Sequence, residues 1–219
     1  MELFAPDSGT VAEDEGPPAP VCGRPAAAEI RAAVRTLIAA AGDDPDREGL
    51  AGTPARVAHE WHEKFSGYSV DPDALLEHRL GEAADYDDTI LIAGIPFVST
   101  CERHMIPIAG RAHLAYRPRR HLADKPALVA LVDAHARRLQ RQERMTTGIA
   151  QTIDRVLKPR GVAVIVESRD WLDAPHAGRS GIAMVTKCWL GDFRNDSRLR
   201  RELMESLALR AGFERWAAG

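Results

Sequence analysis

Large apolar residues recur at helical spacing in the first part of the chain. Segment 26–41 places them three and four positions apart in an alanine-rich background, and Gly42 with the acids after it ends the pattern. A second helix is expected to start with Thr53 as N-cap and Pro54 at the first helical position, and to end at Ser66-Gly67. The apolar positions of the first helix are Ile30, Val34, Leu37 and Ile38.

After an acidic, irregular stretch the pattern changes to extended chain. Strands are predicted over 89–92 and 97–100, and also over 110–116, where apolar and smaller or polar residues alternate. A β-branched buried strand is predicted over 162–166, with a partner strand over 182–190.

A long helical pattern lies between these two groups of strands. Residues 127–156 predict one helix, or two helices with a bend, ended by Pro159 and Gly161. Residues 197–209 predict a terminal amphipathic helix. Helices first, then strands flanking a long helix, is an α+β order without βαβ repetition.

Composition divides the chain into an arm and one domain. Residues 1–25 combine prolines, glycines and acids with few large apolar groups, which predicts a disordered N-terminal arm. The remaining 26–219, in a chain that is 45% hydrophobic, are long enough for one domain with one core. Within it a helical part is expected over 26–80 and a sheet core over 88–209.

Charge and cysteine content narrow the possible partners and the compartment. A net charge of -3 gives no global basic field for a nucleic acid or an anionic membrane, so neither is expected as a partner. Three scattered cysteines favour a reducing compartment. No apolar run reaches the roughly 18 to 20 residues of a membrane span, and the opening residues lack a signal-peptide pattern, so the expected location is the cytoplasm.

One short motif has the spacing of a metal site. Cys101 and His104 lie three positions apart on a predicted turn, so that a thiolate and an imidazole can reach one zinc ion. The alternative reading of this isolated motif is a small core cysteine and a hydrogen-bonded loop histidine.

A second motif joins a carboxamide to a carboxylate. Gln142 and Glu143 lie in the charged stretch RRLQRQERMT, which is typical of a solvated helix face. A carboxylate beside a carboxamide can also read the donor edge of a guanine or pterin ring. The residues alone leave both readings open.

Several pieces of the sequence, in order and at compatible distances, resemble the GTP cyclohydrolase I family over residues 49–209. The pieces are GTPARV, STCERHM, PIAGRAHLAYRP, RRLQRQERMTTGIAQTI, LKPRGVAVIVE and WLGDF. The resemblance implies a T-fold, which is an antiparallel sheet with helices packed on one face, assembled into a toroidal homo-oligomer, typically a decamer. It also implies active sites between subunits that open the imidazole ring of GTP at C8, release formate and give dihydroneopterin triphosphate for folate and pterin synthesis.

The resemblance also assigns roles to individual positions. It places zinc ligands on Cys101 and His104 and the purine-reading pair on Gln142 and Glu143. Catalytic positions fall on His104, Glu143 and Asp170. Further substrate contacts fall on Glu102, Arg56 and His176.

The chain departs from the family pattern at both the metal and the phosphate positions. Arg103 replaces the first histidine after Cys-Glu, and arginine is never a general base. Leu172 falls on the second zinc cysteine, so a third ligand would have to come from elsewhere. The candidates for that third ligand are Asp170, Asp173, His176 and Cys188, and the family's phosphate-binding Ser, Lys and Arg fall on Pro126, Ala127 and Ala130.

These departures leave three functions open. The first is the family reaction on GTP with a relocated third ligand. The second is an enzyme of the same fold that acts on a smaller, non-triphosphate purine or a pterin. The third is a catalytically inactive paralogue that binds a pterin or assembles with an active subunit.

Overall fold

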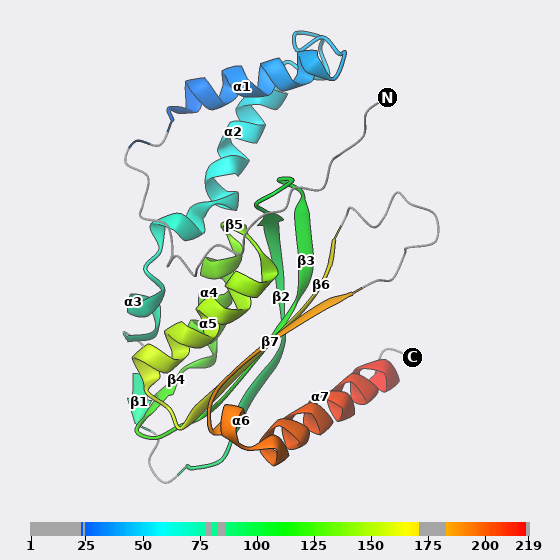
Figure 1. The fold of residues 1–219 in the computed structure, drawn as a ribbon. Helices are drawn as coiled ribbons and strands as arrows, with labels where there is room; N and C mark the ends of the chain where they lie inside the picture. Colours follow the sequence, from blue (N-terminus) through cyan, green and yellow to red (C-terminus); the bar gives the residue numbers. More distant parts are fainter. Residues whose placement is uncertain (1–22, 24, 78–79, 83–85, 171–182, 218–219) are drawn as a thin grey trace, which may run out of the picture. The chain divides into compact units, whose positions relative to one another are not determined.

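A five-stranded sheet organises the C-terminal part of the chain (Figure 1). The strand order is β5-β2-β3-β6-β7, and every neighbouring pair is antiparallel except β2 with β5. A separate two-stranded sheet pairs β1 with β4. The strands are β1 (Leu80–Glu82), β2 (Ile90–Cys101), β3 (Pro107–Arg117), β4 (His121–Ala123), β5 (Leu139–Gln140), β6 (Gly161–Asp170) and β7 (Met184–Gly191).

Strand β2 replaces the two short strands predicted over 89–92 and 97–100. The strand runs through Gly94, where its pairing with β3 shifts between Ile92 and Ile95. Gly94 has a φ of 75°, which glycine adopts without steric cost, so the chain forms a β-bulge and continues instead of ending. The bulge interrupts the alternation that the sequence pattern relies on.

The long helical pattern over 127–156 forms two helices, α4 (Lys125–Ala136) and α5 (Gln142–Leu157). Asp124 caps α4 by accepting a hydrogen bond of 2.7 Å from the backbone N–H of Ala127. Strand β5 separates the two helices because it pairs with β2. The other helices are α1 (Ala27–Ala40), α2 (Thr53–Lys64), the 3-10 helix η1 (Ser66–Ser69), α3 (Pro72–Glu77), α6 (Asp192–Asn195) and α7 (Ser197–Ala217).

Helices pack on both faces of the sheet. On one face α4 and α5 bury the main core, which includes Leu128, Ile149 and Val164. Helices α6 and α7 lie on the other face (Figure 1). There Phe193 of α6 and Leu203 of α7 pack against apolar residues of β3 and β6. Helices α4 and α5 match the expectation of helices packed on one face, whereas α6 and α7 add a layer on the opposite face that the expectation did not include. A row of small and apolar residues on this second face provides the surface on which α6 and α7 dock.

The structure, a computed structural model, describes residues 23, 25–77, 80–82, 86–170 and 183–217. The chain divides into two compact units, Met1–His59 and Glu60–Gly219. The predicted helix over 26–41 is confirmed as α1, and the terminal helix extends beyond its predicted end to Ala217. Of the predicted arm, residues 1–22 and 24 lie outside this description. None of the helices in the described ranges is both long and apolar enough to cross a lipid bilayer.

Candidate metal and base-binding site

A tight turn at the end of β2 brings the thiol of Cys101 and the imidazole of His104 together. The turn is closed by two backbone hydrogen bonds of 2.8 Å, from Cys101 N–H to Ile106 O and from Met105 N–H to Cys101 O. Met105 takes a φ of 57°, a left-handed conformation that is uncommon for a residue other than glycine. Such a conformation persists only where the surrounding structure enforces it, and functional sites are frequent locations.

The separation of these two side chains fits a shared zinc ion. Cys101 Sγ lies 3.7 Å from His104 Nδ1. A sulfur at about 2.3 Å and a nitrogen at 2.0 to 2.1 Å from one tetrahedral zinc are about 3.6 Å apart. Within the described part of the chain, no group of three or more His, Cys, Asp or Glu side chains is arranged to hold a metal. Among these described residues, Cys101 and His104 are thus a pair at metal-ligand spacing without a third such side chain beside them.

The start of α5 lies directly beside this turn. Cys101 pairs with Gln140 in the parallel β2–β5 ladder, and the N–H of Glu102 donates to Gln140 O at 3.1 Å. The Glu102 carboxylate then faces two arginines of the helix start, Arg141 Nε at 3.9 Å and Arg144 Nη1 at 3.6 Å. Both arginine side chains are about half exposed, so each ion pair contributes little stability by itself. Glu102 is thus held beside the helix that carries the Gln-Glu motif.

The two members of that motif have different environments. Glu143 is exposed in the first turn of α5, where a carboxylate is favoured by the helix dipole. Gln142 is buried, and its amide bonds to the sheet instead of facing solvent. Its Nε2 donates towards Val166 O at 2.9 Å, Met184 O at 3.1 Å and Thr186 Oγ1 at 3.1 Å. The resemblance gave both residues a role in reading the base. In the structure Glu143 is open to a ligand, whereas the Gln142 amide is bonded to the sheet.

Asp170 ends β6 at the same end of the sheet as Cys101. Its backbone pairs with Ile108, which in turn pairs with Ser99 of β2. Two strand spacings, about 10 Å, therefore separate Asp170 from the segment that carries Cys101. Of the two candidate third ligands that the structure describes, Asp170 and Cys188, Asp170 is the one whose backbone lies near the pair.

The other predicted site residues fall elsewhere. Cys188 pairs with Val164 in the middle of β6 and packs on the main core, so within one copy of the chain it lies far from Cys101. Arg56 belongs to the N-terminal unit, where its guanidinium donates to Thr53 Oγ1 at 3.0 Å. Asp173 and His176 lie outside the described residues.

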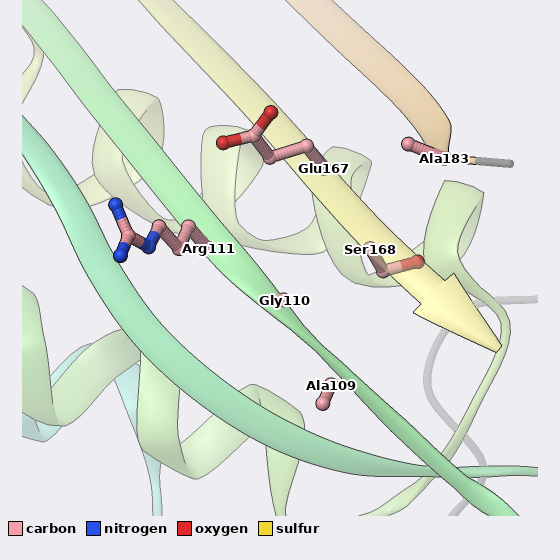
Figure 2. Close-up of a pocket in the computed structure, with 6 residues that line it drawn as sticks. All are labelled: Ala109, Gly110, Arg111, Glu167, Ser168 and Ala183. Carbon is pink, nitrogen blue, oxygen red and sulfur yellow. The ribbon is translucent and has the colours of Figure 1, made fainter. Parts of the chain in front are cut away.

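A shallow pocket on the other face of the sheet was not predicted from the sequence. Its volume is about 380 Å³, and Figure 2 shows its residues on neighbouring strands. Arg111 and Glu167 lie opposite each other in the β3–β6 register, and Glu167 Oε1 is 3.4 Å from His113 Nε2. No motif signals these residues because they come together only when the strands pair. The lining residues are Ala109, Gly110, Arg111, Glu167, Ser168 and Ala183.

Comparison with known proteins identifies the family. The family model described as GTP cyclohydrolase I matches residues 30–208. The chain is 47% identical over 172 residues to the GTP cyclohydrolase 1 of Brucella abortus strain S19, covering 78% of this chain and 81% of that protein. It is 46% identical over the same length and coverage to the GTP cyclohydrolase 1 of Brucella canis. A crystal structure of an archaeosine synthase QueF-like protein matches 49% of this chain and 96% of its own, with 16% identity and a TM-score of 0.39, too low to support an argument. On the strength of the sequence matches, the chain belongs to the GTP cyclohydrolase I family of hydrolases.

Proposed function

We propose that this protein is a GTP cyclohydrolase I, which opens the imidazole ring of GTP at C8, releases formate and forms dihydroneopterin triphosphate. The observation that carries the proposal is the Cys101–His104 pair, 3.7 Å apart, in a turn that is hydrogen-bonded to the segment preceding α5. That helix presents Glu143 to solvent three residues after Gln140, the partner of Cys101. Ring opening needs an activated water and a group that holds the base. The Cys101–His104 pair could bind the metal that activates water, and Glu143 could hold the base.

In the proposed reaction, separate residues of this chain bind the metal, the base and the rest of the substrate. Cys101 and His104 would hold a zinc ion, with Asp170, Asp173 or His176 completing the set. When bound, zinc polarises water and so supplies the nucleophile for ring opening. Glu143 accepts hydrogen bonds from the N1–H and 2-amino groups of guanine, because an ionised carboxylate is an acceptor only. Glu102, Arg56 and His176 remain proposed substrate contacts.

The proposal extends to the assembly. As in the family, the sheet and helices form a T-fold, and copies of the chain assemble into a toroidal homo-oligomer with sites between neighbours. A decamer is the expected number. A subunit boundary is also where the phosphate-binding groups missing from this copy would be supplied.

The test is incubation of the zinc-loaded protein with GTP, followed by measurement of formate and of pterin fluorescence. Wild type is expected to give both products and to bind zinc stoichiometrically. Cys101→Ala should lose zinc and both products, whereas Cys188→Ala, at the distant cysteine, should keep them. A zinc-loaded wild type that yields neither formate nor pterin would overturn the proposal.

A second candidate is an enzyme of the same fold that acts on a purine or pterin without a triphosphate. Pro126, Ala127 and Ala130 carry no charge where the family binds phosphates. Arg117, a possible replacement, is hydrogen-bonded at 2.6 Å to Asp192 and so is already paired. Turnover of guanosine at a higher kcat/KM than GTP would favour this function. Guanosine or pterin binding without any turnover would favour the inactive, co-assembling paralogue, for which Arg103 in place of a histidine is the supporting observation.

A further inference from the structure

Four polar side chains meet beneath the first turn of α5, and we call them the amide cluster. They are Gln142 and Thr146 of α5, Ser168 of β6 and Thr186 of β7. Thr146 Oγ1 donates to Gln142 O at 2.8 Å and lies 2.6 Å from Thr186 Oγ1, while the hydroxyl of Ser168 donates to Gln142 Oε1. Gln142, Thr146 and Ser168 are each at most 6% exposed. The cluster is therefore a dry, closely connected network.

Both hydrogens of the Gln142 amide are already engaged within the protein, and its oxygen accepts one hydrogen bond there. Its nitrogen carries two hydrogens and already has three acceptors within 3.1 Å, and its oxygen accepts from Ser168. Turning the amide towards a bound ring would leave Val166 O and the Ser168 hydroxyl buried without partners, which is costly. A side chain so fully engaged is suited to holding structure in place.

The cluster joins α5 to two strands at once. Val166 and Thr186 form one rung of the β6–β7 ladder, and Ser168 and Met184 form the last one described before the connection between the strands. Gln142 bonds to all four of these residues. These bonds fix the rotation of the first turn of α5 and its distance from the sheet. Because Glu143 directly follows Gln142 in that turn, its backbone position is fixed as well.

We propose that Gln142 is a positioning residue that aims Glu143 at the guanine base, and that it does not read the base itself. The inference rests on the proposed function, since it takes Glu143 as the group that accepts from the guanine N1–H and 2-amino groups. Two parallel hydrogen bonds to one carboxylate require a fixed direction of approach. The amide cluster fixes the backbone at the start of α5, and this backbone sets the direction in which the Glu143 carboxylate points.

The experiment compares the dissociation constants of guanosine and inosine, which differ only in the 2-amino group, by calorimetry with the full-length protein. Wild type should favour guanosine by about tenfold or more, because a hydrogen bond to a carboxylate is lost with inosine. Glu143→Ala should bring the ratio close to one. Ser168→Ala, which removes only the hydroxyl that orients Gln142, should reduce the ratio severalfold, and Thr186→Val should act in the same direction. Ser168→Thr, which keeps the hydroxyl, should restore the ratio.

Ser99 provides a matched control. It is another serine buried in the same sheet, 3% exposed, but its hydroxyl finds no hydrogen-bond partner among the residues that the structure describes. Ser99→Ala should leave the guanosine-to-inosine ratio unchanged, which separates positioning from a general loss of packing. Thermal unfolding of each variant checks that the fold is retained.

The possible outcomes separate the inference from the function on which it rests. If Gln142 reads the base through the exocyclic oxygen O6, Ser168→Ala weakens guanosine and inosine equally and the ratio persists, which overturns the inference alone. If Ser99→Ala lowers the ratio as much as Ser168→Ala, the inference is also overturned. A wild type that binds neither nucleoside overturns both the inference and the proposed base site.

Discussion

Cys101 and Cys188 occupy opposite ends of one sheet, and their surroundings differ. Across the sheet, Cys188 pairs with Val164, Val164 with Leu114, and Leu114 with Ile92. Ile92 lies nine residues before Cys101 on β2. At about 3.3 Å per residue, about 30 Å separates the two levels. Both cysteines pack against the main core, but polar groups also surround Cys101, namely His104, Glu102 and the arginines at the start of α5.

The difference lies in the groups that accompany each cysteine. Cys101 has an imidazole at a metal-ligand distance and lies on a turn that is partly open to solvent. Burial raises the pKa of the Cys188 thiol, and Arg194 only partly opposes that effect, so Cys188 is held in its neutral form. The sheet keeps the polar chemistry at one end and apolar packing near the other, so each end can be perturbed by itself.

The largest effect is expected from Phe193→Ala, at the apolar end. Phe193 is fully buried against β3, β6 and α7, so its truncation should lower the free energy of unfolding by about 3 to 5 kcal/mol. Urea denaturation measures the loss, and Tyr86→Ala, at an exposed aromatic, should change it by less than about 0.5 kcal/mol. Zinc stoichiometry of the folded variant should match wild type. Loss of zinc by a folded Phe193→Ala protein would contradict the independence of the two ends.

A smaller effect is expected from acid, through His135, which is buried in α4. Its backbone oxygen accepts from Gln140 Nε2, and its own Nε2 has no partner. Burial, followed by the nearby Arg138, lowers its pKa from 6.5 to about 4. The unfolded chain therefore binds this proton more readily between pH 6.5 and 4. Stability present above pH 6.5 should be lost as pH falls through that window, by about 3 kcal/mol at pH 4.

Urea denaturation at pH 7 and at pH 4 measures this loss. Because carboxylates also titrate in this range, the comparison is with His135→Gln, which should lose about 3 kcal/mol less than wild type over the same interval. His104→Gln, at the exposed histidine, should keep the wild-type dependence. Equal pH dependence in wild type and His135→Gln would show that His135 is not the group responsible.

Local pattern was enough to predict part of this arrangement. Helix α1, the strands at the centre of the sheet and the Cys101–His104 turn follow from spacing and turn chemistry within a few residues. The break between α4 and α5 cannot be predicted from local spacing, because it depends on the pairing of Leu139–Gln140 with β2, about forty residues earlier. The hydrogen bonds of Gln142 could not be predicted for the same reason, since its partners Ser168 and Thr186 lie 26 and 44 residues away.

The smallest effect is expected in the alkylation of Cys188, and it sharpens the comparison of the two cysteines most directly. Iodoacetamide reacts with the thiolate, and a raised pKa lowers the thiolate fraction at neutral pH. Peptide mapping after partial labelling at pH 7.5 should therefore find Cys188 modified severalfold more slowly than the same peptide in urea-unfolded protein, with the difference narrowing as pH rises. Added zinc should protect Cys101 and leave Cys188 unchanged, because only Cys101 has the imidazole of His104 beside it. Protection of both cysteines by zinc would mean that the metal site, or a zinc-linked change in the sheet, reaches the apolar end.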